Sequence, residues 1–186
     1  SHWSGYFVNW LKEVSETIAP GLKNYHSSYL KEREQLSMIN KRLRLLVKEP
    51  FYDHKMKVLM SIPGIGFYTA VTFLSEIGNI KRFKNEREFA GFIGIVPTCH
   101  DSGDNEKTGS MTFRQNRHLA SMLIEAAWSA IRCDIALAAC YGQLTRRMEN
   151  NKAIIRIARK LSNRILMVLK TEQKYICGTN DQKRES

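Results

Sequence analysis

The stretch that decides the fold reads Ser61-Ile62-Pro63-Gly64-Ile65-Gly66, and apolar residues flank it at helical spacing on both sides. A glycine–apolar–glycine turn between two short apolar helices is typical of a helix-hairpin-helix. Glycine lets the backbone come close to a ligand, and the N–H groups that open the next helix attract anions. Gly64, Ile65 and Gly66 are therefore predicted to contact a phosphate group. A tight turn between two core helices, without any ligand, is the other interpretation that the same residues allow.

Positive charge is concentrated in the second half of the chain, whose net charge is +11 overall. Residues 107–186 hold 15 Lys and Arg against 6 Asp and Glu, whereas residues 1–106 hold 14 against 12. This distribution predicts a surface that faces a polyanion, with phosphate the usual partner, and a generic basic protein is the other interpretation that the charge allows. The candidate contacts outside the turn are Lys81, Arg82, Lys84, Arg156, Arg159 and Lys160. No apolar run approaches the 18 residues that a membrane-spanning helix needs, so no membrane contact is expected.

Apolar residues recur every three or four positions along most of the chain, which predicts an all-α fold. Within residues 22–47, seven of eight positions at alternating spacings of three and four are apolar, and Glu32 is the exception. Such a seam is typical of a coiled coil or of a long helix docked on another, so a helical hairpin and a dimerising arm both stay open. Further helices are predicted at residues 3–18, 55–60, 67–77, 86–92, from 113 onward, 135–148 and 152–170. No run has a period of two, so little or no sheet is expected.

Local signals divide the chain into three parts. Pro50 is predicted to end a helical arm over residues 1–50, and a helical domain with the central helix-hairpin-helix follows over residues 51–172. A polar tail is expected over residues 173–186. Within the domain, Asn85 is predicted to cap a helix, and Asn150-Asn151 is predicted to separate the last two helices.

The four cysteines, Cys99, Cys133, Cys140 and Cys177, form no closely spaced pair. Metal sites need tighter spacing, so no metal or other cofactor is expected in this chain. Cys133 and Cys140 lie seven positions apart and are expected to be buried apolar side chains in a reducing, cytoplasmic protein. The chain opens with Ser1-His2-Trp3 rather than with Met and a signal peptide, so we expect a piece of a longer protein.

A polar loop runs from Thr98 to Thr112 and contains Asp101-Ser102-Gly103. Read alone, this tripeptide is ordinary turn chemistry. A nucleophilic serine needs a base or a metal to activate it, and positive charge to stabilise the group that it attacks. The neighbours at positions 100 and 101 reach their own serine poorly, whereas Arg114 and Arg117 would suit an attacked phosphate. From the residues alone, the turn is favoured over a catalytic site.

Several short motifs occur in a specific order between Leu59 and Ala127. They are the turn at residues 61–66, Glu76-Ile77-Gly78, Arg82-Phe83, Phe89-Ala90-Gly91-Phe92-Ile93-Gly94, Pro97, Ser102-Gly103, Gly109, Asn116-Arg117, Leu119, Leu123 and Glu125-Ala126-Ala127. Their order and spacing resemble the C-terminal transposase domain of the Insertion Sequence 110 family, also called the 116/110/902 group. The chain departs from the family's usual residues at Phe113, Gln115, Ala120, Asp104 and Glu106.

The resemblance implies a DNA recombinase that binds double-stranded DNA in the bacterial cytoplasm, at the nucleoid. Family members carry an N-terminal ribonuclease-H-like domain with acidic ligands for Mg²⁺, then a coiled coil, then this domain. A serine in the last domain attacks the DNA backbone, and in at least some members a structured guide RNA directs the choice of site. By position that serine is Ser102, and Arg114, Asn116 and Arg117 become contacts to nucleic acid. No acidic cluster here resembles the metal-binding domain, so the isolated chain is expected to bind DNA or RNA without completing recombination.

Two other functions stay open at this point. The first is a non-catalytic helix-hairpin-helix module of a repair or recombination factor, in which Ser102 is only a loop residue. The second is a helical interaction protein whose seam between residues 22 and 46 is its main functional surface. A homodimer or higher oligomer through the arm is compatible with each of these functions.

Overall fold

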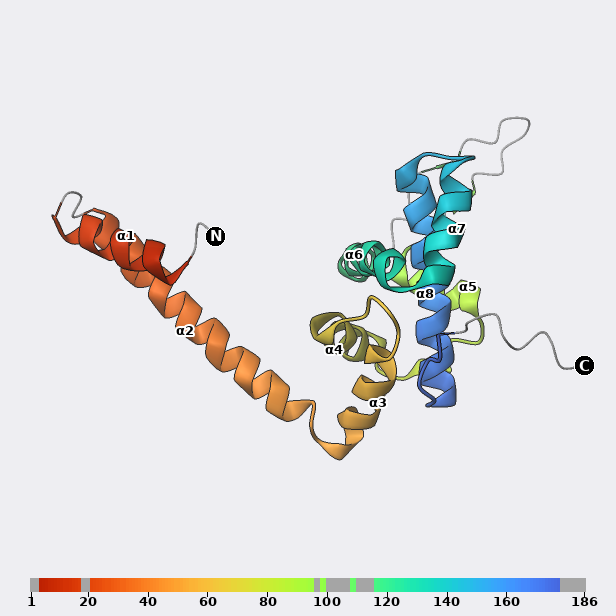
Figure 1. Cartoon of the computed structure of the whole chain (residues 1–186). Coiled ribbons are helices and arrows are strands. Elements are labelled where there is room, and N and C mark those ends of the chain that lie inside the picture. Colours follow the sequence, from red (N-terminus) through yellow and green to blue (C-terminus); the bar gives the residue numbers. More distant parts are fainter. Residues whose placement is uncertain (1–3, 18–20, 96–97, 100–107, 110–115, 178–186) are drawn as a thin grey trace, which may run out of the picture. The chain divides into compact units, whose positions relative to one another are not determined.

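The protein is described by a computed structural model, which places residues 4–17, 21–95, 98–99, 108–109 and 116–177 (Figure 1). Within these ranges the secondary structure consists of eight α-helices, one 3₁₀-helix and two paired strands of two residues each. The predicted all-α fold is confirmed. The chain divides into two compact units, Ser1–Glu49 and Pro50–Ser186. None of the described helices is both long and apolar enough to cross a membrane.

The first unit is a pair of helices, α1 (Gly5–Thr17) and α2 (Leu22–Leu46). The long helix predicted over residues 22–47 is therefore a single helix of 25 residues. Helix α1 folds back beside the N-terminal half of α2, and Val8 and His26 are buried in this unit (Figure 1). The C-terminal half of the seam stays uncovered within the unit, because Leu36 and Ile39 are 59% and 60% exposed.

The second unit begins with a helical hairpin of α3 (Pro50–Met60) and α4 (Phe67–Ile77). A short 3₁₀-helix η1 (Ile80–Arg82) and helix α5 (Glu86–Ile93) follow. The predicted start of α3 at residue 55 is wrong, because Pro50 opens this helix. Proline suits the first helical position, where its fixed φ matches the helix and its missing N–H costs no hydrogen bond. The predicted cap of α5 is confirmed, since the Asn85 side chain accepts a hydrogen bond from the Glu88 N–H at 2.9 Å.

Strand β1 (Thr98–Cys99) pairs antiparallel with β2 (Thr108–Gly109), and three helices complete the unit. These helices are α6 (Arg117–Cys133), α7 (Ile135–Thr145) and α8 (Asn150–Thr171). The predicted break at Asn150-Asn151 is wrong, because both residues lie in the first turn of α8 and Glu149 is its N-cap. The chain instead leaves α7 at Arg146, after which turn hydrogen bonds reach back to Leu144.

Helix α8 is the centre of the core and packs against α3, α5, α6 and α7 (Figure 1). All six residues of its predicted apolar face are buried: Ile154, Ile157, Ala158, Leu161, Ile165 and Val168. Burial of an aliphatic side chain of this size contributes about 1.5–3 kcal/mol. By contrast, the predicted burial of Cys133 and Cys140 is wrong, since Cys133 is exposed and Cys140 only half-buried. Cys133 is the last residue of α6, and Cys140 lies on α7, in which Leu137 is the only buried side chain.

The segment after α8, residues 172–177, returns toward the α3–α4 hairpin, and we call it the C-terminal strap. Glu172 has a positive φ of 56°, which turns the chain back at the end of α8. Its carbonyl oxygen accepts a hydrogen bond from His54 Nε2 at 2.9 Å. The Tyr175 N–H donates to Ser61 Oγ at 2.7 Å, and Ser61 Oγ donates to the Val58 carbonyl at 2.6 Å. The strap therefore holds the first residue of the hairpin turn in place.

A buried ion pair fixes the other end of the strap. Asp134 is 1% exposed and caps α7 by accepting from the Leu137 N–H at 2.9 Å. Arg164 Nη1 lies 2.7 Å from the same carboxylate, and its guanidinium covers the Tyr175 ring at 4.5 Å. Burial alone would raise the pKa of Asp134, but the Leu137 N–H and Arg164 outweigh that effect and hold the pKa below its ordinary value. Cys177 Sγ, 3.5 Å from the carboxylate, completes the cluster.

Candidate nucleic-acid interface

The turn between α3 and α4 is closed by backbone hydrogen bonds and by two buried side chains. The Ile65 N–H donates to the Ile62 carbonyl at 3.0 Å, and both isoleucine side chains are buried. Gly64 adopts a φ of +89°, and its Cα faces α6 so closely that an added Cβ would lie 2.7 Å from the Ala130 Cβ and would also clash with the Ala126 carbonyl. Gly64 is thus needed for the close approach of two backbones within the protein.

The surroundings of Gly66 differ from those of Gly64, because Gly66 is exposed and forms the N-cap of α4. It has no side chain to cap the first turn, and a Cβ added there would have no atom within 4 Å. The first N–H groups of a helix lack acceptors within that helix, and the helix dipole is positive at this end. The exposed Tyr68 lies in the same turn. Of the three predicted turn residues, Gly66 therefore presents its backbone to solvent, while Ile65 is buried and Gly64 faces α6.

The predicted basic residues after α4 lie in η1 or just after it. Lys81, Arg82 and Lys84 are exposed, and the Asn79 side chain accepts from the Lys81 N–H at 2.9 Å. The Arg82 guanidinium lies 4.6 Å from the ring centres of both Phe83 and Phe92. The two aromatic rings thus hold the Arg82 guanidinium, whereas Lys81 and Lys84 have no such ring beside them among the contacts of the described residues.

Asn116 and Arg117 open helix α6, and their surroundings differ. The Asn116 Oδ1 accepts from the Leu119 N–H at 3.1 Å, and its Nδ2 donates to Glu76 Oε2 at 2.8 Å. Both ends of this amide are thus engaged in capping α6 and in linking it to α4. Arg117 is exposed at the helix start, within the same part of the surface as Asn116. Arg117 is therefore the better placed of the two for a contact with phosphate.

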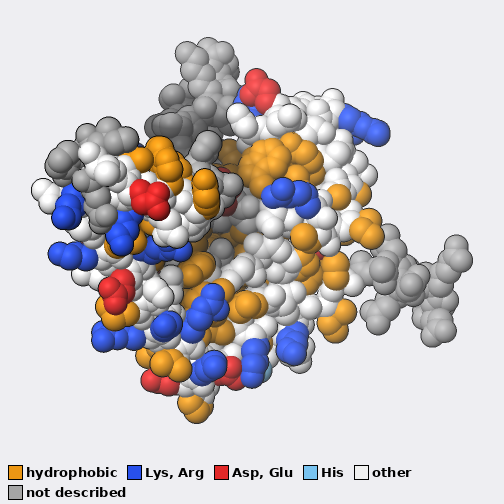
Figure 2. Space-filling model, turned by 60° about the vertical axis from the view of Figure 1, so that its left-hand side comes forward, with side chains coloured by type: hydrophobic (Ala, Val, Ile, Leu, Met, Phe, Trp, Pro, Cys, Tyr) orange, Lys and Arg blue, Asp and Glu red, His pale blue; other side chains and the backbone are white. Residues whose placement is uncertain are grey.

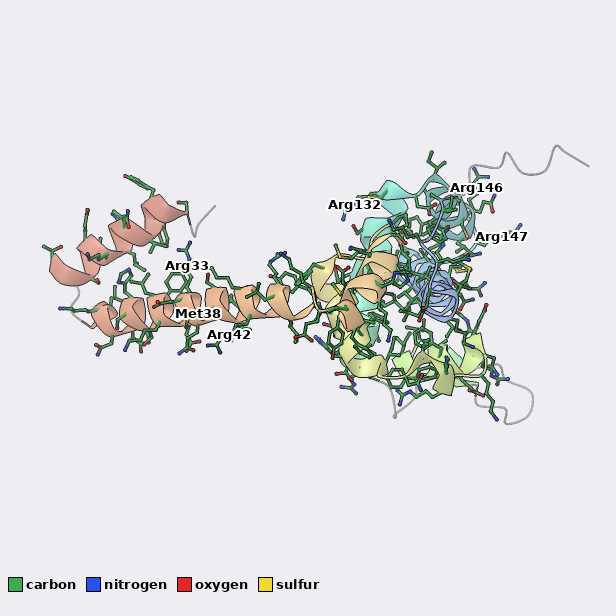
Figure 3. All side chains as sticks on the ribbon, turned by 90° about the horizontal axis from the view of Figure 1, so that it is seen from below. Arg33, Met38, Arg42, Arg132, Arg146 and Arg147 are labelled. Carbon is green, nitrogen blue, oxygen red and sulfur yellow. The ribbon has the colours of Figure 1, made fainter. Side chains whose placement is uncertain are left out.

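Helix α8 presents Arg156 and Lys160 to solvent one turn apart, and Arg159 is half-buried between them. Lys and Arg side chains are spread over the face shown in Figure 2, among exposed apolar side chains. Sequence reasoning passed over Arg132, Arg146 and Arg147, which are exposed and project from the second unit (Figure 3). For Arg146 and Arg147, the adjacent pair of arginines after a predicted helix is the signal that could have indicated them.

The candidate nucleophile Ser102 and the candidate contact Arg114 lie outside the described residues. The structure does describe the base of the loop that contains Ser102, because Thr98 pairs with Gly109 and Cys99 with Thr108. Among the described residues, no three His, Cys, Asp or Glu side chains come together as a metal site.

The chain is similar to one family model and to several known proteins. Residues 56–143 match the model of the transposase IS116/IS110/IS902 family. The transposase for insertion sequence element IS1111A of Coxiella burnetii is 31% identical over 64% of this chain and 34% of that protein. The transposase for insertion sequence element IS1328 of Yersinia enterocolitica is 27% identical over 57% of this chain and 31% of its own length. The pilin gene-inverting protein of Moraxella bovis is 25% identical over 78% of this chain and 47% of its own length.

These comparisons support a relationship between this chain and the IS116/IS110/IS902 transposase family. The family match runs from α3 into α7, so it includes the α3–α4 turn, the exposed residues around η1 and the segment that contains Ser102. The chain spans about a third to a half of the length of the relatives named above. The resemblance seen in the motifs between residues 59 and 127 thus agrees with the family comparison.

Proposed function

We propose that this chain is the nucleic-acid-binding, serine-carrying part of an insertion-sequence transposase. The observation that carries the proposal is the family match over residues 56–143, because this stretch contains both the α3–α4 hairpin and the loop with Ser102. In this proposal the hairpin acts as a helix-hairpin-helix. The whole protein exchanges DNA strands in transposition, and the chain supplies the binding surface and the attacking hydroxyl.

The start of α4 would bind one backbone phosphate. Its exposed N-cap at Gly66 and the positive end of its dipole suit an anion. Lys81 and Lys84 would hold further phosphates, as would Arg117, Arg156 and Lys160 on α6 and α8. Such contacts fix the position of a duplex without reading its bases. A structured guide RNA offers the same phosphate chemistry, so site choice would come from base pairing rather than from these side chains.

Ser102 would act as the nucleophile of strand cleavage. Its Oγ forms a bond to phosphorus while the bond from phosphorus to one strand oxygen breaks, and that oxygen leaves as a hydroxyl. The serine proton passes to a base and from that base to the leaving oxygen, and the positive charges of Arg114 and Arg117 stabilise the negative charge on the attacked phosphate. Attack of a second strand's hydroxyl on the phosphoserine bond reverses the chemistry and releases Ser102. The free energy of the broken phosphodiester bond is retained in the phosphoserine bond until the strands are rejoined.

Mg²⁺ belongs, in this proposal, to the ribonuclease-H-like domain that the resemblance implies. The described residues of this chain hold no group of three potential metal ligands. In this proposal the chain supplies the binding of nucleic acid and the serine, and the metal-binding role follows from the resemblance alone.

We also propose that two copies of the chain associate through α2. The exposed part of its seam, around Leu36, Ile39 and Leu46, is apolar, and an identical surface on a second copy complements it. Such pairing brings two serine-carrying units to one recombination site, which strand exchange between two DNA segments needs.

The deciding experiment replaces Ser102 by Ala in the full-length transposase. The covalent protein–DNA adduct and the strand exchange should fall at least ~10³-fold, because loss of a nucleophile removes the covalent path. Duplex affinity should stay within about twofold, since the phosphate contacts stay in place. Ser110→Ala is the matched control, because it removes another hydroxyl from the same part of the sequence and should recombine normally. Wild-type recombination by Ser102→Ala would contradict the catalytic role and favour the non-catalytic binding module.

A further inference from the structure

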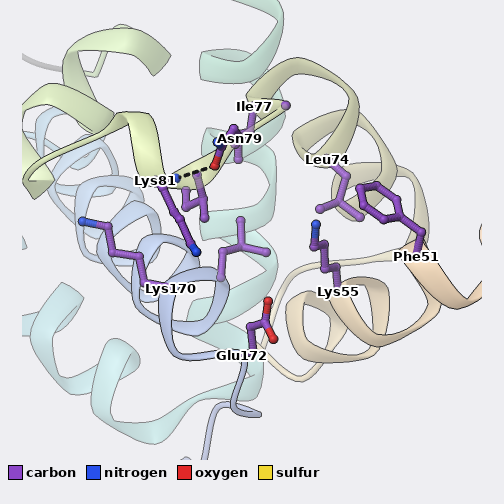
Figure 4. A pocket seen from close by; sticks show the side chains of 11 residues that line it. Phe51, Lys55, Leu74, Ile77, Asn79, Lys81, Lys170 and Glu172 are labelled. Atoms are coloured by element: carbon purple, nitrogen blue, oxygen red, sulfur yellow. Dashed lines mark hydrogen bonds between the residues drawn. The ribbon is translucent and has the colours of Figure 1, made fainter.

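A pocket of 650 Å³ lies between the end of α4, η1, the end of α8 and the start of α3 (Figure 4). Its volume lies within the range of sites that enclose a small ligand. It is separate from the first turn of α4, since the end of α4 lines it and its start does not. The lining residues are Phe51, Lys55, Leu74, Ile77, Gly78, Asn79, Ile80, Lys81, Leu169, Lys170 and Glu172.

The floor of the pocket is apolar. Ile77 and Leu169 are buried, and Leu74 and Ile80 are half-buried beside them. Phe51 forms one edge of the pocket and is 65% exposed. A surface of this kind favours a planar ligand such as a nucleobase, because bases stack on aromatic side chains whatever their sequence.

The rim of the pocket is basic. Lys55 and Lys81 reach in from opposite sides, whereas Lys170 turns away and donates to the Lys84 carbonyl at 3.2 Å (Figure 4). The Lys55 ammonium lies 4.2 Å from the centre of the Phe51 ring. In the part of the chain that the structure describes, no ion pair involves Lys55 or Lys81. Glu172 is the one carboxylate in the lining, so the rim keeps a net positive charge.

We infer that this pocket takes one unpaired nucleotide of the nucleic-acid strand held by the hairpin, with its base on the apolar floor and its phosphate at the lysines. The inference rests on the proposed function, because a strand bound at the start of α4 is what delivers the nucleotide. Helix α4 has 11 residues, so its two ends lie about 15 Å apart, close to the rise of four or five base pairs. A base within a duplex cannot enter a pocket until it leaves its stack.

The test compares a single-stranded 15-mer of deoxythymidine with a blunt 15-base-pair duplex, by fluorescence anisotropy at one salt concentration. Leu74→Trp fills the pocket without changing charge, and Phe51→Ala removes its aromatic edge. Each variant should weaken binding of the single strand about 5- to 20-fold and binding of the duplex less than twofold. Lys57→Ala is the control outside the pocket, since Lys57 lies on the same helix as Phe51, pairs with Asp53 and does not line the pocket.

A second measurement locates the nucleotide directly. An oligonucleotide with 5-iodouracil should crosslink on irradiation to Phe51, and mass spectrometry identifies the attached peptide. Equal losses for single strand and duplex, or no loss in either pocket variant with circular dichroism unchanged, would overturn the inference. So would binding of free thymidine monophosphate as tight as that of the 15-mer, which would assign the pocket to a free nucleotide. If the wild-type chain binds no duplex, the proposed function itself fails.

Discussion

At the scale of single residues, Gly64 is the position at which the role indicated by the structure differs most from the role predicted by the sequence. Its φ of +89° is strained for any residue with a Cβ, and the added atom would also meet the backbone of α6. Gly64→Ala should therefore lower the free energy of unfolding of the second unit by about 2–4 kcal/mol. Urea unfolding followed by circular dichroism measures this loss.

Gly66→Ala is the matched control for Gly64→Ala. Gly66 has an ordinary φ of −88° and open space around its Cα, so the same substitution should cost less than about 1 kcal/mol. If both variants lose equal stability, the close approach of the turn to α6 is not what requires glycine at position 64.

The two glycines also show what a sequence motif can predict. The turn itself was predictable, because its glycines and flanking apolar residues are local signals. The separate tasks of Gly64 and Gly66 were not, since they depend on Ala126 and Ala130, which lie some sixty positions further along the chain. Similarly, Asn116 was predicted as a contact to nucleic acid, but its amide is engaged with Leu119 and Glu76.

At the scale of elements, the exposed apolar half of α2 predicts that a charged substitution in this seam changes the oligomeric state. If a second copy covers the seam, Ile39→Glu places a charge in a formerly apolar interface on each copy. The dimer should lose about 3 kcal/mol or more, which raises its Kd by about 100-fold. Light scattering coupled to size-exclusion chromatography should show a monomer at concentrations where the wild type is a dimer.

Ser37→Glu is the control for this substitution, because it adds the same charge to α2 outside the seam. Ser37 is exposed, and its variant should keep the wild-type mass. A wild-type chain that is monomeric at every concentration would contradict pairing through α2.

The helices themselves differ in how well local sequence predicted them. Helix α4 was predicted to the residue, because glycines flank its apolar run on both sides. Apolar periodicity also predicted six buried residues of α8, but four further residues of that helix, Ala153, Ser162, Leu166 and Leu169, are buried as well. The start of α3 and the break before α8 were missed. A proline can end a helix or begin one, and Pro50 begins α3. In the same way, the pair Asn150-Asn151 can open a helix as well as break one. The C-terminal strap was beyond prediction, since its contacts to Ser61 and Asp134 join positions far apart in sequence.

At the scale of the whole molecule, the excess of positive charge predicts binding that depends on salt. Each phosphate contact releases counterions, so log Kd should rise linearly with log salt by about 0.9 for every phosphate bound. Arg156→Ala and Lys160→Ala should each weaken duplex binding by a similar factor for every sequence and lower that slope by about one. Lys57→Ala should leave the slope unchanged, because Asp53 already neutralises its charge. Anisotropy titrations of one duplex between about 50 and 200 mM salt measure the slope. A slope near zero for the wild type would mean that phosphate contacts do not dominate, whatever the net charge of the chain.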